Sequence, residues 1–154
     1  MSELTIGQKA PAISAKDQNG NTVSLDQFKG KTVVLYFYPK DDTPGCTAEA
    51  CDFRDNYQGL TAKGIVVLGV SVDDEKSHQK FVTKHNLPFT LLADTEQKIV
   101  TDYGVWGEKN MYGKKYMGTN RATFIIDENG DITHFIKKVD TKNATAQVLE
   151  LLNH

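Results

Sequence analysis

The chain has 154 residues, about the size of one domain and enough to bury a hydrophobic core, so we expect a single domain over residues 1–154. The formal net charge is −2, and no cluster of lysine and arginine indicates a nucleic-acid partner. The longest apolar runs, Val33–Tyr38 and Ile65–Val70, are too short to cross a membrane, and Met1–Thr5 lacks the basic and apolar regions of a secretory signal.

The first half of the chain predicts a hairpin followed by alternating strands and helices. Asp17-Gln18-Asn19-Gly20 is a typical hairpin turn, and Val33–Tyr38 is the continuous apolar run expected of a central strand covered on both faces. The predicted elements are the strands Ala12–Lys16, Asn21–Ser24, Thr32–Tyr38 and Ile65–Ser71, the helix Cys46–Lys63 with Gly64 after it, and the helix Glu75–His85 with Phe81 and Val82 inward.

The second half predicts shorter elements and another hairpin. They are the strand Phe89–Ala93, the helix Gln97–Tyr103, the strands Ala122–Asp127 and Asp131–Ile136 around Glu128-Asn129-Gly130, and the helix Ala144–Asn153. This order is typical of an α/β fold with a mixed central sheet flanked by helices. Ligands of such sheets bind beyond the carboxyl ends of the strands, and Cys46 follows one of those ends.

Both cysteines of the chain, Cys46 and Cys51, lie in one short run after the first long strand. Thr43 is a typical N-cap, whose hydroxyl can accept from a free backbone amide, and Pro44 suits the first helical position. Cys46 would then lie on the first turn of a helix, where the amides and the helix dipole favour a thiolate over a thiol. The sequence therefore predicts a reactive Cys46 near the surface, whereas Cys51 also fits a small buried hydrophobic residue.

The spacing of the two cysteines limits how they can react. Positions i and i+5 of a helix have Cα atoms about 8.6 Å apart, whereas a disulfide needs roughly 4.4–6.8 Å. A bond between Cys46 and Cys51 would therefore require the first turns of the helix to unwind. The pair predicts a redox element with two states rather than a permanent cross-link.

Several motifs resemble the peroxiredoxin family. Tyr38-Pro39-Lys40 followed by Thr43-Pro44-Gly45-Cys46-Thr47 resembles its active-site loop, Pro-x-x-x-Thr-x-x-Cys, and a second cysteine five positions later is similar to the bacterioferritin comigratory protein, or peroxiredoxin Q, subfamily. The resemblance continues through residues 69–71, 87–94, 103–105 and 121–127, and so covers nearly the whole chain. It implies a thioredoxin-like fold with an N-terminal β-hairpin, and a thiol peroxidase with no cofactor and no metal.

The resemblance also implies a role for each matching residue. Cys46 would attack a peroxide and become a sulfenic acid, which Cys51 would resolve as an intramolecular disulfide. Thr43 would hydrogen-bond the thiolate or the peroxide, Pro39 would shield the sulfenic acid from water, and Arg121 would stabilise the thiolate and the leaving oxygen. The substrates would be hydrogen peroxide and organic hydroperoxides, and thioredoxin or a similar dithiol would reduce the disulfide.

Arginine is rare in this chain, because the eighteen basic residues comprise sixteen lysines and only Arg54 and Arg121. A chain that otherwise uses lysine is expected to place arginine where a rigid, always charged fork matters, which favours Arg121 as a site residue. Arg54 lies between two aspartates on the cysteine helix. We interpret it as mainly structural, with support of the active site as a second role.

Three acidic residues flank the motif. Glu49, one turn after Cys46, could bond within the site, but we expect it to be a solvated helix residue. Asp41 and Asp42 depart from the family pattern, and two carboxylates close to a thiolate would disfavour its charge.

Three alternatives use the same residues. A disulfide reductase usually carries Cys-x-x-Cys, and the longer spacing here argues against it. A zinc site needs about four ligands; His78 and His85 could join the two cysteines, but we expect both histidines to be solvated. A cysteine hydrolase needs a histidine partner, and His134 is the only histidine on a predicted strand but has no recognisable partner motif.

Composition and resemblance together predict the setting of the protein. Two cysteines are too few for a secreted disulfide scaffold, so we expect a cytoplasmic antioxidant enzyme whose thiols stay reduced until they act. We also expect a monomer that binds neither nucleic acid nor membranes. Trp106, Met111, Tyr112 and Tyr116 could form an apolar wall that favours organic peroxides, or could be ordinary packing.

Overall fold

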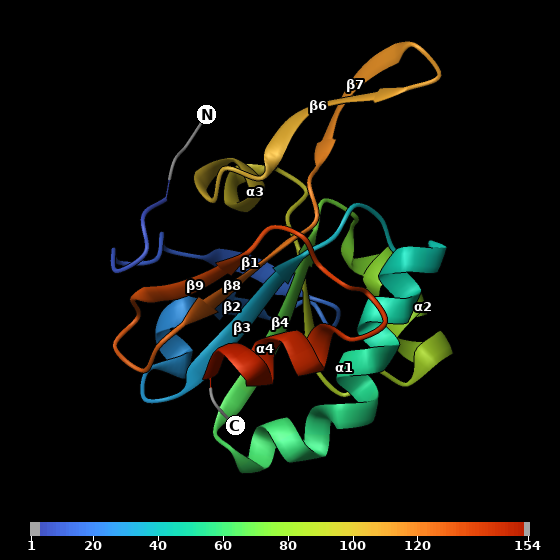
Figure 1. The fold of residues 1–154 in the computed structure, drawn as a ribbon. Helices are drawn as coiled ribbons and strands as arrows, with labels where there is room; N and C mark the ends of the chain where they lie inside the picture. The colour runs from blue at the N-terminus through green and yellow to red at the C-terminus, as the bar shows by residue number, and fades with distance from the viewer. Residues whose placement is uncertain (1–3, 153–154) are drawn as a thin grey trace.

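The structure is a computed structural model that describes residues 4–152 (Figure 1). The first three residues of Met1–Thr5, in which a secretory signal was not expected, lie outside the described residues. So does Asn153, the last residue of the predicted C-terminal helix.

Seven strands form one mixed sheet in the described chain. Across the sheet they are β2 (Thr22–Ser24), β1 (Ser14–Asp17), β5 (Thr90–Ala93), β4 (Ile65–Ser71), β3 (Thr32–Phe37), β8 (Ala122–Ile126) and β9 (Ile132–Ile136). The strands β3, β4 and β5 run parallel, and the other neighbouring pairs are antiparallel. Both the predicted mixed sheet and the predicted N-terminal hairpin are confirmed.

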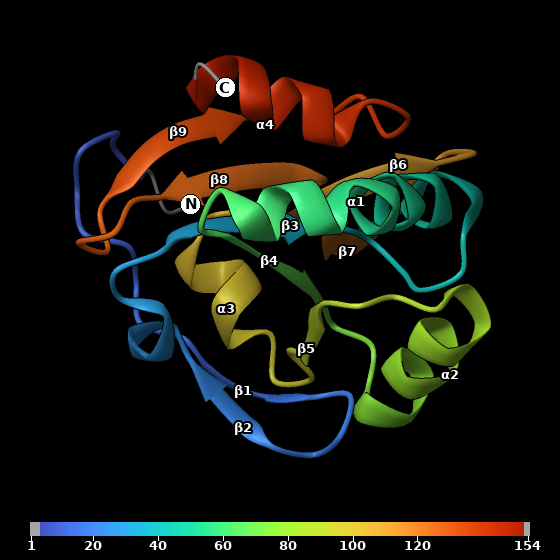
Figure 2. The ribbon, with the colours of Figure 1, turned by 90° about the horizontal axis from the view of Figure 1, so that it is seen from below.

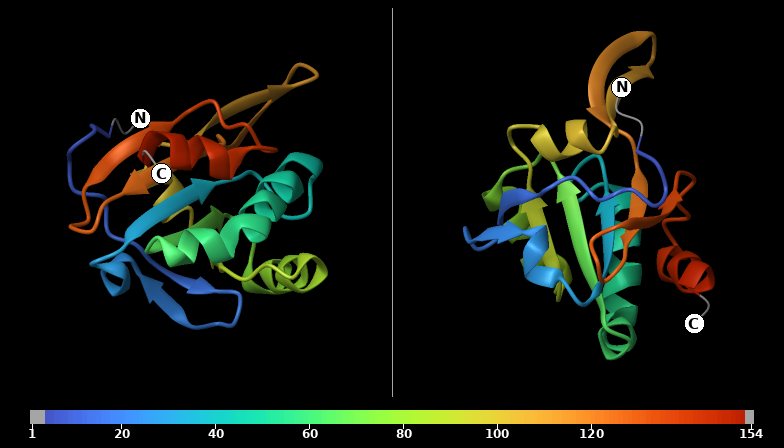
Figure 3. Two further views of the ribbon diagram at one scale, coloured as in Figure 1. Left: turned by 60° about the horizontal axis from the view of Figure 1, so that its bottom comes forward. Right: turned by 90° about the vertical axis from the view of Figure 1, so that its left-hand side faces the viewer.

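The predicted helices are also present, with ends that differ by at most two residues and with the predicted bounds Glu75–His85 matched. They are α1 (Pro44–Ala62), α2 (Glu75–His85), α3 (Lys98–Asp102) and α4 (Ala144–Leu152), and a short 3-10 helix spans Leu25–Phe28. The helices α1 and α4 pack against each other (Figure 3). The helix α1 begins two residues before Cys46, so the cysteine lies within its first turn.

The alternation of side chains along β3 explains why both faces of the sheet are covered. Successive side chains of a strand point to opposite faces. Val33, Leu35 and Phe37 join a core cluster with α3, while Val34 and Tyr36 join a second cluster with α1, α2 and α4. Figure 2 shows α1 lying across β3. The start of α1 is therefore placed directly over the second cluster.

A hairpin that the sequence analysis did not predict projects from the body in Figure 1. It consists of β6 (Trp106–Met111) paired antiparallel with β7 (Lys114–Thr119). Its turn residues Tyr112 and Gly113 have φ angles of 53° and 80°, and a two-residue hairpin turn of type I′ requires such positive values. The usual sequence signal of such a turn is Asn-Gly or Asp-Gly, and Tyr112-Gly113 does not match it, so the turn was not predicted.

The sequence analysis left two interpretations of Trp106, Met111, Tyr112 and Tyr116, an apolar wall beside the site or ordinary packing. The structure of the hairpin tests the second. Tyr112 is 99% exposed, and Met111 and Tyr116 are exposed as well, so ordinary core packing is excluded for these three. Trp106 is half-buried and packs against the first core cluster, as ordinary packing predicts.

Candidate active site

The cysteine motif opens α1 as predicted, but its N-cap residue bonds differently. Thr43 has the extended backbone of an N-cap, and Pro44 occupies the first turn. The Thr43 hydroxyl donates a hydrogen bond to the carbonyl oxygen of Lys40 at 2.9 Å and makes no capping bond to an amide. The expectation that it accepts from an amide is therefore wrong, because this hydroxyl closes the loop between β3 and α1. Pro39, in the same loop, is half-buried.

Cys46 is not at the surface, because its residue is only 1% exposed. It belongs to the core cluster that includes Tyr36, Tyr38 and Ala50. The predicted surface position is therefore wrong. The reason is tertiary: the aromatic side chains at the end of β3 form a layer on which the first turn of α1 packs, so this helix start is covered rather than solvated.

Arg121 contacts both Cys46 and Glu49. Its Nη2 lies 3.1 Å from the Cys46 Sγ, and its Nη1 lies 2.7 Å from the Glu49 Oε1. The sheet register brings it there, because Ala122 at the start of β8 pairs with Phe37 at the end of β3. Arginine is the residue expected where one rigid fork must contact two partners, so the structure brings the predicted pair Cys46 and Arg121 together.

Gly45 makes room for this arginine. A Cβ atom at position 45 would lie 3.2 Å from the Arg121 Nη2, which is tighter than ordinary van der Waals contact. The glycine before Cys46 therefore lets the guanidinium approach the sulfur. In the sequence Gly45 is only one residue of the motif, and its contact with Arg121 is visible only in the fold.

Glu49 is fully buried, so the expectation that it is solvated is wrong. Burial raises the pKa of its carboxyl from 4.5 to about 7, although the neighbouring Arg121 opposes the shift. One carboxyl oxygen is bonded to Arg121, and the other, Oε2, has no hydrogen-bond partner within the described chain. A buried carboxyl that holds an arginine in place is typical of a functional site rather than of a helix surface.

Two further residues belong to this environment and were missed from the sequence. The hydroxyl of Tyr36 is buried without a partner within residues 4–152, and burial, followed by the charges of Glu49 and Cys46, raises its pKa well above the usual value. Lys109 on β6 has a pKa lowered by partial burial and by Arg121. Alternation along β3 could have placed Tyr36 beneath the helix, but nothing pointed to Lys109 because its hairpin was not predicted.

Asp41, which the sequence analysis expected to act on the thiolate, is bonded to Tyr38 and to α2. Its carboxylate accepts hydrogen bonds from the hydroxyls of Tyr38 and Ser77 and lies 2.6 Å from the Nδ1 of His78. His78 is completely buried, and its Nε2 lies 2.9 Å from the carbonyl oxygen of Leu92. The expectation that His78 is solvated is therefore wrong: it ties the active-site loop to the core.

Asp42 also bonds to α2. Its carboxylate lies 2.8 Å from the Lys84 Nζ and 3.3 Å from the His85 Nε2, and these two partners lower its pKa. The His85 side chain is 19% exposed, so this histidine is mostly covered rather than solvated. Both carboxylates of the loop, Asp41 and Asp42, are therefore bonded to side chains of α2.

Cys51 and Arg54 lie on the part of α1 that faces α2, away from the Arg121 contact. Cys51 is half-buried, and its Sγ lies 3.9 Å from the His85 Nδ1. Arg54 donates to Asp55 and to the carbonyl oxygen of His85, both at 2.9 Å, which fits its predicted structural role. Both thiols are free, and both belong to one uninterrupted helix.

The other sites considered from the sequence are not formed in residues 4–152. No group of three or more histidine, cysteine, aspartate and glutamate side chains there is placed to hold a metal ion. No helix in that range combines the length and apolar composition needed to cross a membrane. His134 on β9 is half-buried and bonds to the hydroxyl of Thr133.

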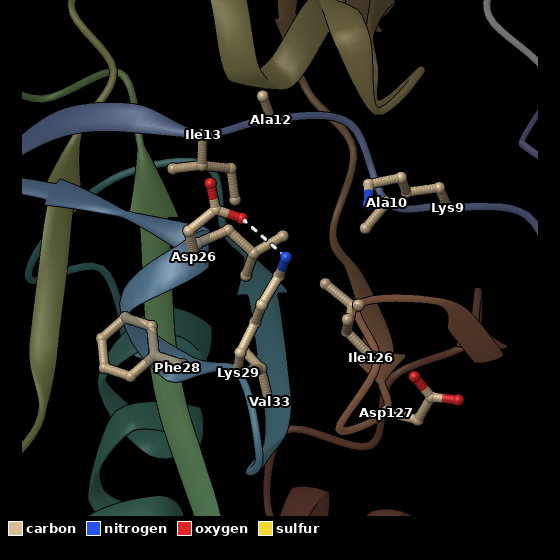
Figure 4. Close-up of a pocket in the computed structure, with 12 residues that line it drawn as sticks. Lys9, Ala10, Ala12, Ile13, Asp26, Phe28, Lys29, Val33, Ile126 and Asp127 are labelled. Carbon is tan, nitrogen blue, oxygen red and sulfur yellow. Dashed lines mark ion pairs between the residues drawn. The ribbon is translucent and has the colours of Figure 1, made fainter.

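A cavity of about 400 Å³ lies at the opposite end of β3 (Figure 4). Val33, Phe28 and Ile126 are apolar residues of its lining, and Lys29 and Asp26, which also line it, form an ion pair. No predicted site residue lines this cavity. The chemistry around Cys46 is therefore separate from it.

The chain is similar to proteins of one family over nearly all its length. The AhpC/TSA family model matches residues 6–135. A putative peroxiredoxin bcp of Coxiella burnetii is 51% identical, with 95% of this chain and 97% of that protein covered, and peroxiredoxin Bcp of Bacillus subtilis is 49% identical, with 97% and 95% covered.

Solved structures agree with this match. A Xylella fastidiosa PrxQ variant superposes with a TM-score of 0.92 at 29% identity, covering 99% of this chain and 98% of that one. A Xanthomonas campestris bacterioferritin comigratory protein, whose structures concern alkyl peroxide reduction, has a TM-score of 0.86 at 35% identity, with 92% and 90% covered. These matches confirm the predicted thioredoxin-like fold, and the chain belongs to the AhpC/TSA family as a peroxidase of the peroxiredoxin Q, or Bcp, type.

Proposed function

We propose that the protein is a thiol-dependent peroxidase in which Cys46 reduces hydrogen peroxide and organic hydroperoxides. The observation that carries the proposal is the 3.1 Å contact between the Cys46 Sγ and the Arg121 Nη2, within a chain of the peroxiredoxin family. The alkyl peroxide reduction described for the Xanthomonas campestris relative supports organic hydroperoxides as substrates.

In the first step the Cys46 thiolate attacks one peroxide oxygen. The S–O bond forms as the O–O bond breaks, so Cys46 becomes a sulfenic acid and the other oxygen leaves as hydroxide or alkoxide. That anion takes a proton from solvent and becomes water or an alcohol. Arg121 contacts the sulfur and donates toward the charge that develops on the leaving oxygen. Its second arm is held by Glu49, which fixes the direction of the fork.

The loop residues complete the proposed site. Thr43 donates to Lys40 in this structure, and its hydroxyl would have to turn toward the sulfur to bond the peroxide. Pro39, half-buried in the same loop, would shield the sulfenic acid from water. Arg54, which contacts α2 rather than Cys46, acts through the structure only.

In the second step Cys51 resolves the sulfenic acid as an intramolecular disulfide. The two cysteines lie five positions apart in an uninterrupted helix, which ideal geometry puts at about 8.6 Å between Cα atoms. The first turns of α1 therefore unwind when the bond forms. Thioredoxin or a similar dithiol then reduces the disulfide.

The proposal extends to the setting of the enzyme. The chain acts as one domain over residues 1–154, as a monomer in the cytoplasm, where it limits peroxide damage without nucleic acid or membranes as partners. The small number of cysteines supports this setting, because two are too few for a secreted disulfide scaffold.

The decisive experiment compares the wild type with Cys46→Ser in an assay of peroxide consumption driven by thioredoxin. We expect Cys46→Ser to lose all activity, since a serine hydroxyl stays protonated at neutral pH and is a poor nucleophile. Substantial turnover by this variant would rule out Cys46 as the attacking group.

The resolving step has its own measurement. Mass spectrometry of peroxide-treated wild type should find a Cys46–Cys51 disulfide, and amide exchange over residues 44–51 should rise on oxidation while β3 and β4 stay protected. Unchanged exchange in the disulfide form would exclude the unwinding of α1.

A further inference from the structure

A histidine and a carboxylate stand beside the second cysteine, where α1 meets the end of α2. The His85 Nδ1 lies 3.9 Å from the Cys51 Sγ, and its Nε2 lies 3.3 Å from the Asp42 Oδ1. Nucleophilic thiols are commonly activated by such a base when a third group orients it, and these distances are often loose before the reaction begins. The three residues come from α1, the loop before it and α2, so only the fold brings them together.

Several contacts hold His85 in this orientation. Its ring stands edge-on to the ring of Phe81, with centroids 5.3 Å apart. Its carbonyl oxygen accepts a hydrogen bond from the Arg54 Nη1 at 2.9 Å. Arg54 lies three positions after Cys51 and so shares its face of the helix. The face of α1 that carries Cys51 is therefore tied to the residue that carries the base.

Asp42 has two partners on α2 that favour its charged form, although its side chain is 46% exposed. Its second oxygen accepts from the Lys84 Nζ at 2.8 Å, and its backbone has the left-handed φ of 60° that non-glycine residues seldom adopt. Hydrogen bonds from Lys84 and then His85 lower the pKa of this carboxyl. A carboxylate at Nε2 places the ring proton on that nitrogen, which leaves the lone pair of Nδ1 directed at Cys51.

We propose that His85, oriented by Asp42, accepts the thiol proton of Cys51 when that thiol attacks the sulfenic acid of Cys46. This rests on the proposed function, in which Cys51 is the resolving cysteine. The Cys51 sulfur, once deprotonated, forms the S–S bond as the S–O bond of Cys46 breaks. The leaving hydroxide takes the proton from the His85 imidazolium and departs as water. Cys51 sulfur is oxidised and Cys46 sulfur is reduced, so no further reagent is needed.

The position of the base matches the motion that the reaction requires. The first turns of α1 must unwind to bring Cys46 within reach, whereas the face with Cys51 and Arg54 is bound to α2. The proton acceptor therefore lies beside the cysteine whose face of α1 contacts α2. The charged groups that face His85 are Asp42 from the loop, Arg54 from α1 and the adjacent Lys84.

The test is a single-turnover measurement on the full chain with hydrogen peroxide, in wild type, His85→Asn and the matched control His134→Asn. Quenched samples are analysed by mass spectrometry for trapped sulfenic acid and for the Cys46–Cys51 disulfide. At pH 7 we expect His85→Asn to slow disulfide formation by roughly 10- to 100-fold, a modest effect for a lost base because a free cysteine is already partly thiolate. His134→Asn should behave as wild type.

Two further readouts separate proton transfer from a structural role. Above about pH 8.5, where a cysteine ionises unaided, His85→Asn should approach the wild-type rate. Added imidazole should partly restore disulfide formation in His85→Gly. Asp42→Asn, which leaves His85 in the fold, should slow the same step by a smaller factor.

Equal rates for His85→Asn and wild type at pH 7 would overturn the proposal, and so would a slow rate that neither higher pH nor imidazole restores. Either result leaves the proposed peroxidase intact. A wild type that forms no Cys46–Cys51 disulfide would instead overturn the resolving step itself, and that result needs no His85 variant.

Discussion

The two cysteines lie on one helix but in opposite kinds of surroundings. Cys46 is 1% exposed and is contacted by an arginine that a fully buried carboxyl holds in place. Cys51 is half-buried and faces a histidine and an exposed aspartate on the side toward α2. The buried cysteine has a rigid cationic partner suited to stabilising charge, whereas the outer one has a partner suited to moving a proton. Two cysteines only five positions apart in the sequence thus lie in surroundings suited to different chemistry.

The largest difference between the two sites should appear when the outer thiol is removed. Cys51→Ser should lose thioredoxin-dependent turnover but still form sulfenic acid at Cys46, which excess peroxide then converts to sulfinic acid. Stopped-flow kinetics and mass spectrometry measure the two steps. Thioredoxin must be the reductant, because a small dithiol can reduce a sulfenic acid directly. Full turnover by this variant would show that Cys51 is dispensable.

The two arginines give a matched comparison of the same side chain in both surroundings. Arg121→Lys keeps the charge but loses the fork that reaches Cys46 and Glu49 together, so kcat/KM should fall by about 10²-fold. Arg54→Lys, on the face toward α2, should change kcat/KM little. Thermal unfolding checks that both variants are folded. Similar activity in the two variants would remove the special role of Arg121.

The buried carboxyl should make stability depend on pH. The pKa of Glu49 is about 7 in the folded protein and about 4.5 when unfolded, so the folded state binds more protons between these values. Its contribution is fully present below pH 4.5 and is lost as pH rises through 7, a change of about 3 kcal/mol. Denaturant unfolding at several pH values should show this slope in wild type and lose it in Glu49→Gln. If the free energy of unfolding depended on pH in the same way in wild type and Glu49→Gln, the raised pKa of Glu49 would be contradicted.

The smallest expected effect concerns the glycine beneath Arg121. Gly45→Ala adds a Cβ 3.2 Å from the Arg121 Nη2, so the guanidinium must shift by a few tenths of an ångström and activity should fall several-fold. The same change favours the helix by up to about 1 kcal/mol. Gly59→Ala, later in α1 and with open space at its Cβ position, should raise stability without lowering activity.

The order of strands and helices could be predicted from the sequence because it depends on local patterns. The apolar run of β3, the Thr-Pro-Gly start of α1 and the hairpin turns all express preferences that neighbouring residues satisfy. The hairpin β6–β7 was not predicted, because Tyr112 in its turn adopts a positive φ that its residue type disfavours. The motif predicted Cys46 and the rarity of arginine predicted Arg121 as site residues, and the structure places their side chains 3.1 Å apart.

What the sequence determined by itself is the residue types of the motif and the place of both cysteines on one helix, since spacing and residue type are local properties. Only the tertiary structure decided their environments. Glu49 is buried because its turn of α1 packs on the sheet, and Arg121 reaches Cys46 because β8 pairs with β3. Asp41 and Asp42 find their partners on α2, in His78 and Lys84. Burial and charge pairing depend on residues far apart in the chain, and no local pattern records them.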